Sequence, residues 1–188
     1  MLRIQNISAA NQQRTLRALY AQTQAYPYAA VLSTSVYTAA GTATGTAFSK
    51  GSGTATGTAG NGPIMPGMIA ALAPSGEQVC IATGGTALPL FGLFGNFIGG
   101  DFDEVGDFTE VGVWRGPAAV FEVLSPAFNS NITSSNDTDA SATSANSRKL
   151  YPDANGVLNA SAVSSGPAVA RLIDYVSSSK IVIELLSV

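Results

Sequence analysis

Short apolar runs broken by glycine and proline constrain the fold of this chain more than any other feature. From residue 63 onward each run is only a few residues long and ends at a turn signal. Residues 68–72 stop before Pro74-Ser75-Gly76, and residues 111–114 are separated from residues 119–124 by Gly116-Pro117. Runs of this length with frequent turns are typical of strands. The spacing predicts an all-β fold, a small barrel or sandwich, with no long helix.

The end of the chain predicts a β-hairpin. Residues 169–175 and 180–186 are apolar-rich, and three consecutive serines lie between them. Side chains alternate between the two faces of a strand. Ile181, Ile183 and Leu185 therefore share one face, which we expect to lie in the core.

Two polar segments interrupt the predicted strands. The hexad Gly-Thr-Ala-Thr-Gly-Thr occurs at 41–46 and again at 53–58, so residues 41–60 are predicted to form either a Thr-rich hairpin or a flexible loop. Residues 125–147 are rich in Ser, Thr, Asn and Asp and are predicted to form an exposed loop. We therefore expect an extended arm over residues 1–30, then one β-barrel domain over residues 31–188.

The arm has too few apolar residues for a core of its own. Residues 14–20 could form a short helix, which Tyr26-Pro27-Tyr28 would end. We predict that the arm contacts a neighbouring subunit, and the alternative is that it docks on its own domain. The predicted interface residues are Arg14, Leu16, Arg17, Leu19, Tyr20, Tyr26 and Tyr28.

Charge is scarce and unevenly distributed. Charged residues make up 11% of the chain and hydrophobic residues 46%, which predicts that partners cover part of the surface. The alternative is a surface made polar by Ser, Thr and Asn. The net charge of −3 argues against nucleic-acid binding. Residues 1–76 carry only basic charges and residues 77–139 are mostly acidic, a pattern that either attracts subunits to one another or arises by chance.

Targeting signals are not evident in the sequence. The first residues lack the apolar region of a signal peptide, and no apolar run is long enough to span a membrane. The single cysteine, Cys80, cannot form an internal disulfide, so nothing indicates secretion. We expect synthesis in a cytoplasm and no membrane association.

The sequence offers little catalytic chemistry. It has no histidine, which removes the commonest general base and metal ligand, and we expect neither catalytic residues nor a cofactor. The acidic segment 101–107 fits a calcium loop only in part, so a solvated turn is favoured over a metal site. Cys80 lies in an apolar run and is interpreted as a buried, unreactive thiol. Trp114, the only tryptophan, is interpreted as a core residue and alternatively as an interface anchor.

Residues 63–188 resemble the head decoration (cement) proteins of tailed bacteriophages. The resemblance is carried by residues 66–72 through 88–94, by residues 112–117 with 120–128, and by the closing hairpin. It implies a small β-barrel or β-tulip fold, commonly trimeric, that binds the outside of an expanded capsid and braces it. The implied partner is the major capsid protein and the implied location is the virion surface. The family supplies no catalytic residues to carry over.

Two further hypotheses remain beside a capsid-stabilising protein. One is a tail, fibre or neck subunit, which would differ in its copy number in virions. The other is a carbohydrate-binding module, for which Tyr26, Tyr28, Tyr37 and Trp114 are the candidate aromatic side chains. A hydrolase that uses the acidic segment is disfavoured by the absence of histidine.

Overall fold

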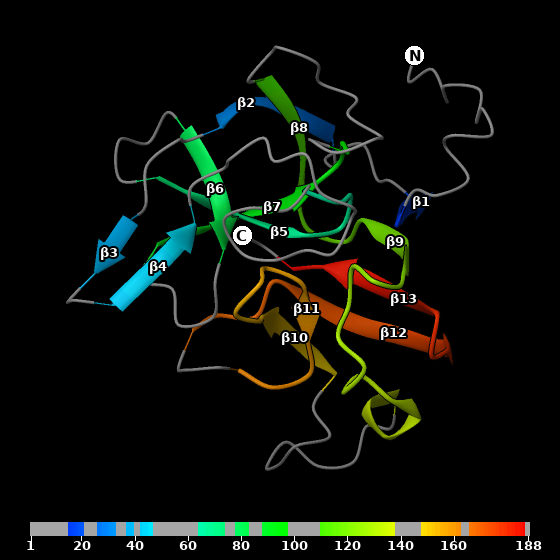
Figure 1. Ribbon diagram of the computed structural model, residues 1–188. Helices are drawn as coiled ribbons and strands as arrows, with labels where there is room; N and C mark the ends of the chain where they lie inside the picture. Colours follow the sequence, from blue (N-terminus) through cyan, green and yellow to red (C-terminus); the bar gives the residue numbers. More distant parts are fainter. Residues whose placement is uncertain are drawn as a thin grey trace.

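The computed structural model (Figure 1) describes ten stretches of the chain. They are residues 15–20, 26–32, 37–39, 42–46, 64–73, 78–82, 88–97, 110–137, 148–162 and 166–186. Their regular structure consists of thirteen strands and one short 3-10 helix, η3 (Ser134–Asp137). The prediction of an all-β barrel or sandwich is therefore confirmed. None of the described residues belongs to a helix that could cross a bilayer.

Six strands form the first sheet, in the order β1-β9-β13-β12-β10-β11. Their bounds are β1 Leu16–Tyr20, β9 Val120–Leu124, β13 Lys180–Leu185, β12 Ala170–Ser177, β10 Lys149–Pro152 and β11 Leu158–Asn159. All neighbours in this order are antiparallel. The predicted closing hairpin is confirmed as β12 and β13, and Ile181, Ile183 and Leu185 are all buried.

Seven strands form the second sheet, in the order β2-β8-β7-β5-β6-β4-β3. Their bounds are β2 Tyr26–Leu32, β8 Glu110–Arg115, β7 Leu90–Phe94, β5 Ile69–Leu72, β6 Gln78–Ala82, β4 Thr42–Thr46 and β3 Tyr37–Ala39. A short parallel pairing between β2 and β6 closes β2, β8, β7, β5 and β6 into a ring. Closure of a sheet into a ring removes edges from the strands that take part.

Apolar side chains on both faces make the seven-stranded sheet the central layer. On β5, Ile69 and Ala71 join the first core cluster, whereas Ala70 between them joins the second. On β6, Cys80 belongs to the first cluster and Ile81 to the second. A sheet buried on both faces needs near-continuous apolar runs, which explains why these strands lack polar alternation.

The first cluster fills the space between the two sheets. Its larger members from the six-stranded sheet are Leu16, Phe121, Val123, Leu150, Leu158, Leu172, Ile181, Ile183 and Leu185. The second cluster lies against the other face of the seven-stranded sheet. Its members are Ile64, Met65, Met68, Ala70, Val79, Ile81, Phe94, Phe97, Val111, Val113 and Val157.

The turn between β10 and β11 joins the two sheets. The Asp153 carboxylate is buried, and its Oδ1 accepts hydrogen bonds from the backbone N–H groups of Asn155 (2.7 Å) and Val157 (3.1 Å). The Gly156 carbonyl accepts a hydrogen bond of 2.7 Å from the Ile69 N–H of β5. Gly156 has a φ of +79°, and a Cβ there would lie 2.2 Å from Cγ2 of Ile81. Glycine is therefore needed for this turn to rest on the central layer.

The structure differs from the sequence-based expectation near the start of the chain. The short helix expected over residues 14–20 is wrong where the structure describes it, because Leu16–Tyr20 is strand β1, paired with β9. Alternation places Leu16 in the core, where it is 6% exposed. Burial of one face against a sheet decides between helix and strand in a segment this short.

The polar segments are described only in part. Residues 42–46 of the first hexad form β4, which pairs with β3 and β6, whereas the second hexad lies outside the described residues. The segment 125–147 is described as far as residue 137. In that part most residues are exposed, but Phe128 and Ile132 are buried and anchor the segment to the core.

Candidate functional site

Clusters of reactive side chains would indicate catalysis or metal binding. In the ten described stretches, no three His, Cys, Asp or Glu residues come together as a metal site would need. The acidic segment 101–107 lies outside them. Cys80 is buried, its Sγ lies 3.8 Å from the Ala71 carbonyl oxygen, and desolvation raises the pKa of its thiol from 9.0 to about 11. Such a thiol is protonated at neutral pH, in line with the interpretation of Cys80 as unreactive.

The structure places the predicted interface residues in two different sheets. Leu16, Arg17, Leu19 and Tyr20 lie in β1, at one end of the six-stranded order. Tyr26 and Tyr28 lie in β2 of the seven-stranded sheet, opposite Arg115 and Val113 of β8. Arg14 falls outside the described residues. Contact of these residues with a neighbouring subunit stays a prediction.

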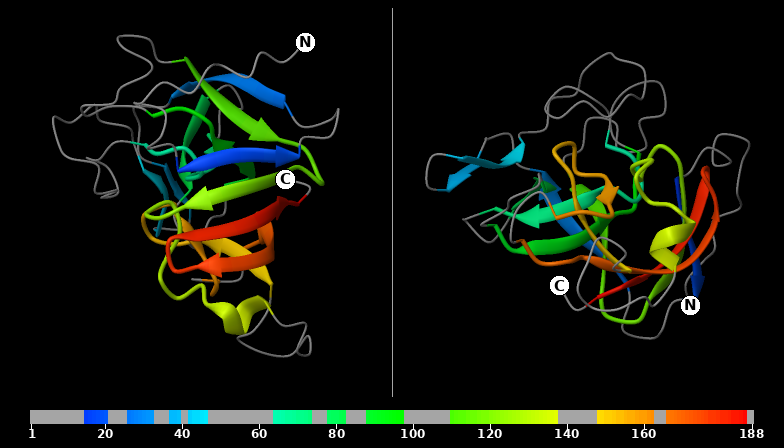
Figure 2. Two further views of the ribbon diagram at one scale, coloured as in Figure 1. Left: turned by 90° about the vertical axis from the view of Figure 1, so that its right-hand side faces the viewer. Right: turned by 90° about the horizontal axis from the view of Figure 1, so that it is seen from below.

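The surface that stands out is the side of the six-stranded sheet that points away from the core, here called the outer face. Figure 2 (left) shows β1, β9, β13 and β12 side by side with no other strand in front of them. Alternation turns every second side chain of β9 and β13 toward the core and leaves the others outside, half-buried. The residues of the outer face are Val120, Glu122, Leu124, Arg171, Asp174, Val176, Lys180, Val182 and Glu184.

Two ion pairs cross the outer face between neighbouring strands. Arg171 of β12 donates from Nε to Glu184 Oε2 at 3.0 Å, and its Nη2 lies 2.5 Å from the same oxygen. Lys180 Nζ of β13 lies 3.4 Å from Glu122 Oε2 of β9. Cross-strand pairs of opposite charge support the strand register at modest energetic gain.

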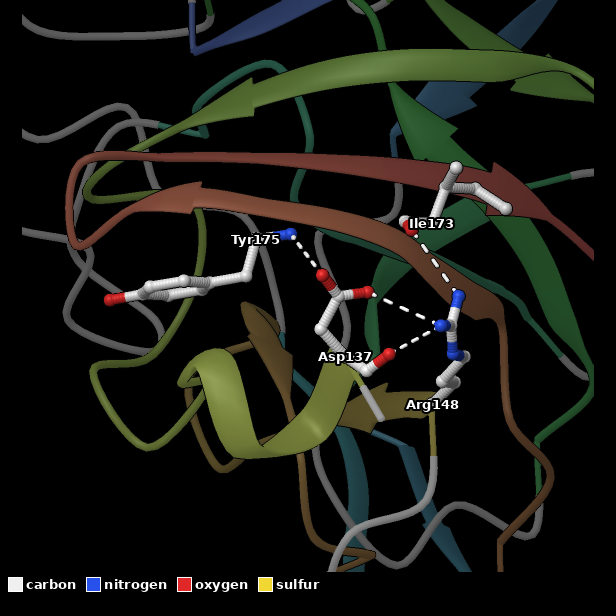
Figure 3. Close-up of polar contacts among 4 residues, drawn as sticks. All are labelled: Asp137, Arg148, Ile173 and Tyr175. Carbon is white, nitrogen blue, oxygen red and sulfur yellow. Dashed lines mark hydrogen bonds and ion pairs between the residues drawn. The ribbon is translucent and has the colours of Figure 1, made fainter. Parts of the chain in front are cut away.

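A second polar cluster fastens η3 to β12 (Figure 3). Arg148 donates from Nη1 to the Ile173 carbonyl at 3.3 Å and from Nη2 to the Asp137 carbonyl, and Nη2 lies 3.5 Å from Asp137 Oδ1. Asp137 Oδ2 in turn accepts from the Tyr175 N–H at 3.5 Å. Because Asp137 and Arg148 bracket residues 138–147, the cluster holds both ends of that segment against β12. These contacts stabilise the position of η3 on β12 and indicate a structural role.

Trp114 is placed within the fold. Its ring packs against the first core cluster and meets Phe121 edge to face, with centroids 5.5 Å apart. A Cβ on Gly95 would lie 2.9 Å from the indole Nε1, so the absence of a side chain there makes room for the ring. The neighbouring Arg115 guanidinium lies over the Phe91 ring, 4.1 Å from its centroid. The core interpretation of Trp114 agrees with these contacts.

Sequence reasoning did not identify the outer face, although the signal was present. The alternation that assigned Ile181, Ile183 and Leu185 to the core also assigns Lys180, Val182 and Glu184 to the opposite face. The sequence does not reveal that β9 and β12 flank β13, and so it does not bring these side chains together with those of other strands.

Comparison with known proteins relates the chain to a family. A sequence model of the phage cement protein family matches residues 1–188. No curated protein and no solved structure matches the chain. The family match extends beyond residues 63–188, on which the resemblance in the sequence rested.

Proposed function

The chain belongs to the phage cement protein family, and from that premise we propose that it binds the outer surface of a phage capsid shell and stabilises the shell as a homotrimer. The observation that carries the proposal is the family match over the full length of the chain. Association with a phage capsid follows from membership of this family, and the family is structural rather than enzymatic. The contact with the outer surface, the trimer and the major capsid protein as partner are parts of the proposal.

Repetition of one weak contact is the physical basis of this role. A capsid presents the same surface many times, so a linked set of small contacts binds far more tightly than any one of them. Three copies in a closed ring would each present the same contact to the shell. The low charge of the chain supports such an assembly, because surface that a monomer would keep solvated by charge is covered by partners.

The start of the chain is proposed to contribute to the assembly. β1 lies at one end of the six-stranded order, and an end strand can accept a further strand along its edge. Leu16 is buried in the core, so any contact with a neighbouring subunit would use the other proposed interface residues. Those residues are Arg14, Arg17, Leu19, Tyr20, Tyr26 and Tyr28.

Co-sedimentation with capsids tests the proposal. Purified protein is mixed with expanded capsids stripped of accessory proteins, and the bound fraction is measured after pelleting, with unexpanded shells as a comparison. We expect saturable binding to expanded capsids and a stoichiometry close to that of the major capsid protein. Bound capsids should resist heat or dilution in low salt better than bare ones. The absence of saturable binding would contradict the proposal.

A further inference from the structure

The outer face of the six-stranded sheet is not covered by any described element of the chain. Its strands lie in front in Figure 2 (left), and the inward side of the same strands is fully packed. Val176, on β12, is 47% exposed. Val120, Leu124 and Val182 are half-buried, and none of the described strands or helices forms a layer above them.

Aliphatic and charged side chains alternate across this face. Val182 is in register with Glu122 on one side and Asp174 on the other. Val120 is in register with Glu184, whose partner is Arg171. Val120 and Val182 are therefore bordered by charged side chains, as the apolar centre of an interface is surrounded by polar residues.

The two ion pairs direct their positive ends outward. In the pair with Glu184, the side chain of Arg171 is 53% exposed and that of the glutamate 22%. In the pair with Glu122, the side chain of Lys180 is 37% exposed and that of the glutamate 16%. A partner that approaches would meet aliphatic side chains, the two cationic groups and the exposed Asp174 before it meets the two glutamates. Complementary chemistry is a surface with apolar side chains, carboxylates opposite Arg171 and Lys180, and a cationic or hydrogen-bond-donating group opposite Asp174.

We infer that the outer face is the surface with which this protein contacts the capsid shell, an inference that rests on the proposed function. The four strands have 5, 5, 6 and 8 residues, and at about 3.4 Å per residue and about 4.8 Å between strands they give a face of roughly 400 Å². A stable contact between two subunits needs about 800 Å² from each partner. The outer face is too small to hold copies of this chain together and suits a contact that gains strength through repetition. The occupant is therefore the shell, through a patch with apolar side chains and charged side chains that complement Arg171, Lys180 and Asp174.

A double substitution on the outer face tests the inference. Val120→Gln/Val182→Gln replaces two aliphatic side chains by neutral polar ones and adds no charge beside Glu122 or Asp174. A matched control, Ser134→Gln/Ala154→Gln, places two glutamines at exposed positions of η3 and of the β10–β11 turn. Binding of all three proteins to stripped, expanded capsids is titrated, and the oligomeric state of each is measured by analytical ultracentrifugation.

The outer-face variant should bind capsids at least tenfold more weakly than the wild type, whereas the control should bind like the wild type. Both should keep the wild-type oligomeric state. Capsid affinity that is unchanged in the outer-face variant would overturn the inference and leave the proposed function intact. Dissociation of the oligomer by that variant would also overturn it, because the face would then join copies of this chain. A wild-type protein that fails to bind would instead contradict the proposed function.

Chemical labelling of the wild-type protein provides a measurement that needs no substitution. Lys180 is partly exposed on the outer face, so acetic anhydride should modify it in the free protein. On decorated capsids its acetylation should fall severalfold, as measured by mass spectrometry of the digested protein. Equal acetylation of Lys180 in free and bound protein would contradict the inference even if the double variant did not fold.

Discussion

The two faces of the six-stranded sheet are built from the same strands but depend on different partners. On β9, Phe121 and Val123 point inward and are fully buried, whereas Glu122 between them lies on the outer face. The inner face packs against apolar side chains of the seven-stranded sheet of the same chain. On the outer face, cross-strand ion pairs join Arg171 to Glu184 and Lys180 to Glu122. Substitutions on the inner face should therefore change folding stability, and those on the outer face should change mainly binding.

The largest effect is expected from Phe121→Ala. The substitution removes a large buried side chain and its edge-to-face contact with Trp114, which should cost about 3–5 kcal/mol of unfolding free energy. The melting temperature should fall by about 10 °C. Glu122→Ala, one residue away on the outer face, is the matched control and should cost less than about 1 kcal/mol. If the two variants lost similar amounts of unfolding free energy in thermal or urea unfolding, the two faces would not differ in their contribution to stability.

The next effect concerns the turn that holds the sheets together. Gly156→Ala puts a side chain at a φ of +79° and against Ile81, so it should destabilise the protein by about 2–4 kcal/mol. Ala154→Gly, at an exposed position of the same turn, should cost no more than about 1 kcal/mol. Urea unfolding measures both changes. If Gly156→Ala left the unfolding free energy unchanged, the packing of the inner face would not depend on this turn.

Cys80 gives a pH-dependent test of the layer against which the inner face packs. Its folded pKa of about 11 lies above its ordinary value of 9.0. As pH rises past 9 the unfolded chain releases the thiol proton first, so the Cys80 contribution is complete below pH 9 and is lost toward pH 11. Between pH 8.5 and 10.5 the unfolding free energy should fall about 2 kcal/mol more in the wild type than in Cys80→Ala. Parallel pH profiles of the two proteins would show that the thiol is not desolvated.

The smallest effect is expected for the ion pair on the outer face. Arg171→Ala and Glu184→Ala, singly and together, form a double-mutant cycle whose coupling energy should be below about 1 kcal/mol, because the arginine is half-exposed. The coupling should weaken further in 1 M salt. Thermal unfolding of the four proteins gives the value. A coupling of several kcal/mol would show that the outer face contributes to folding as strongly as the inner one.

The sequence predicted those features of the fold that depend on local pattern. Alternation identified the closing hairpin and its buried face, and the Gly116-Pro117 turn separated two strands that the structure has as β8 and β9. The sequence-based prediction was wrong at residues 14–20. This segment has so few apolar residues that a helical pattern and a strand pattern fit it equally well. The role of Gly156 was also missed, because a glycine in a turn does not reveal that Ile81, distant in sequence, fills the space beside it.

The sequence by itself determined that the chain is β-rich, that it has little charge to spread over a free surface, and that it resembles phage cement proteins. These conclusions rest on composition and on the period of two, which are properties of neighbouring residues. Only the tertiary structure decided which strands pair, that β2 and β6 close a ring, and that the side chains of β9, β12 and β13 meet on one outer face. Strand pairing joins residues far apart in sequence, and packing of the two core clusters selects among the possible pairings.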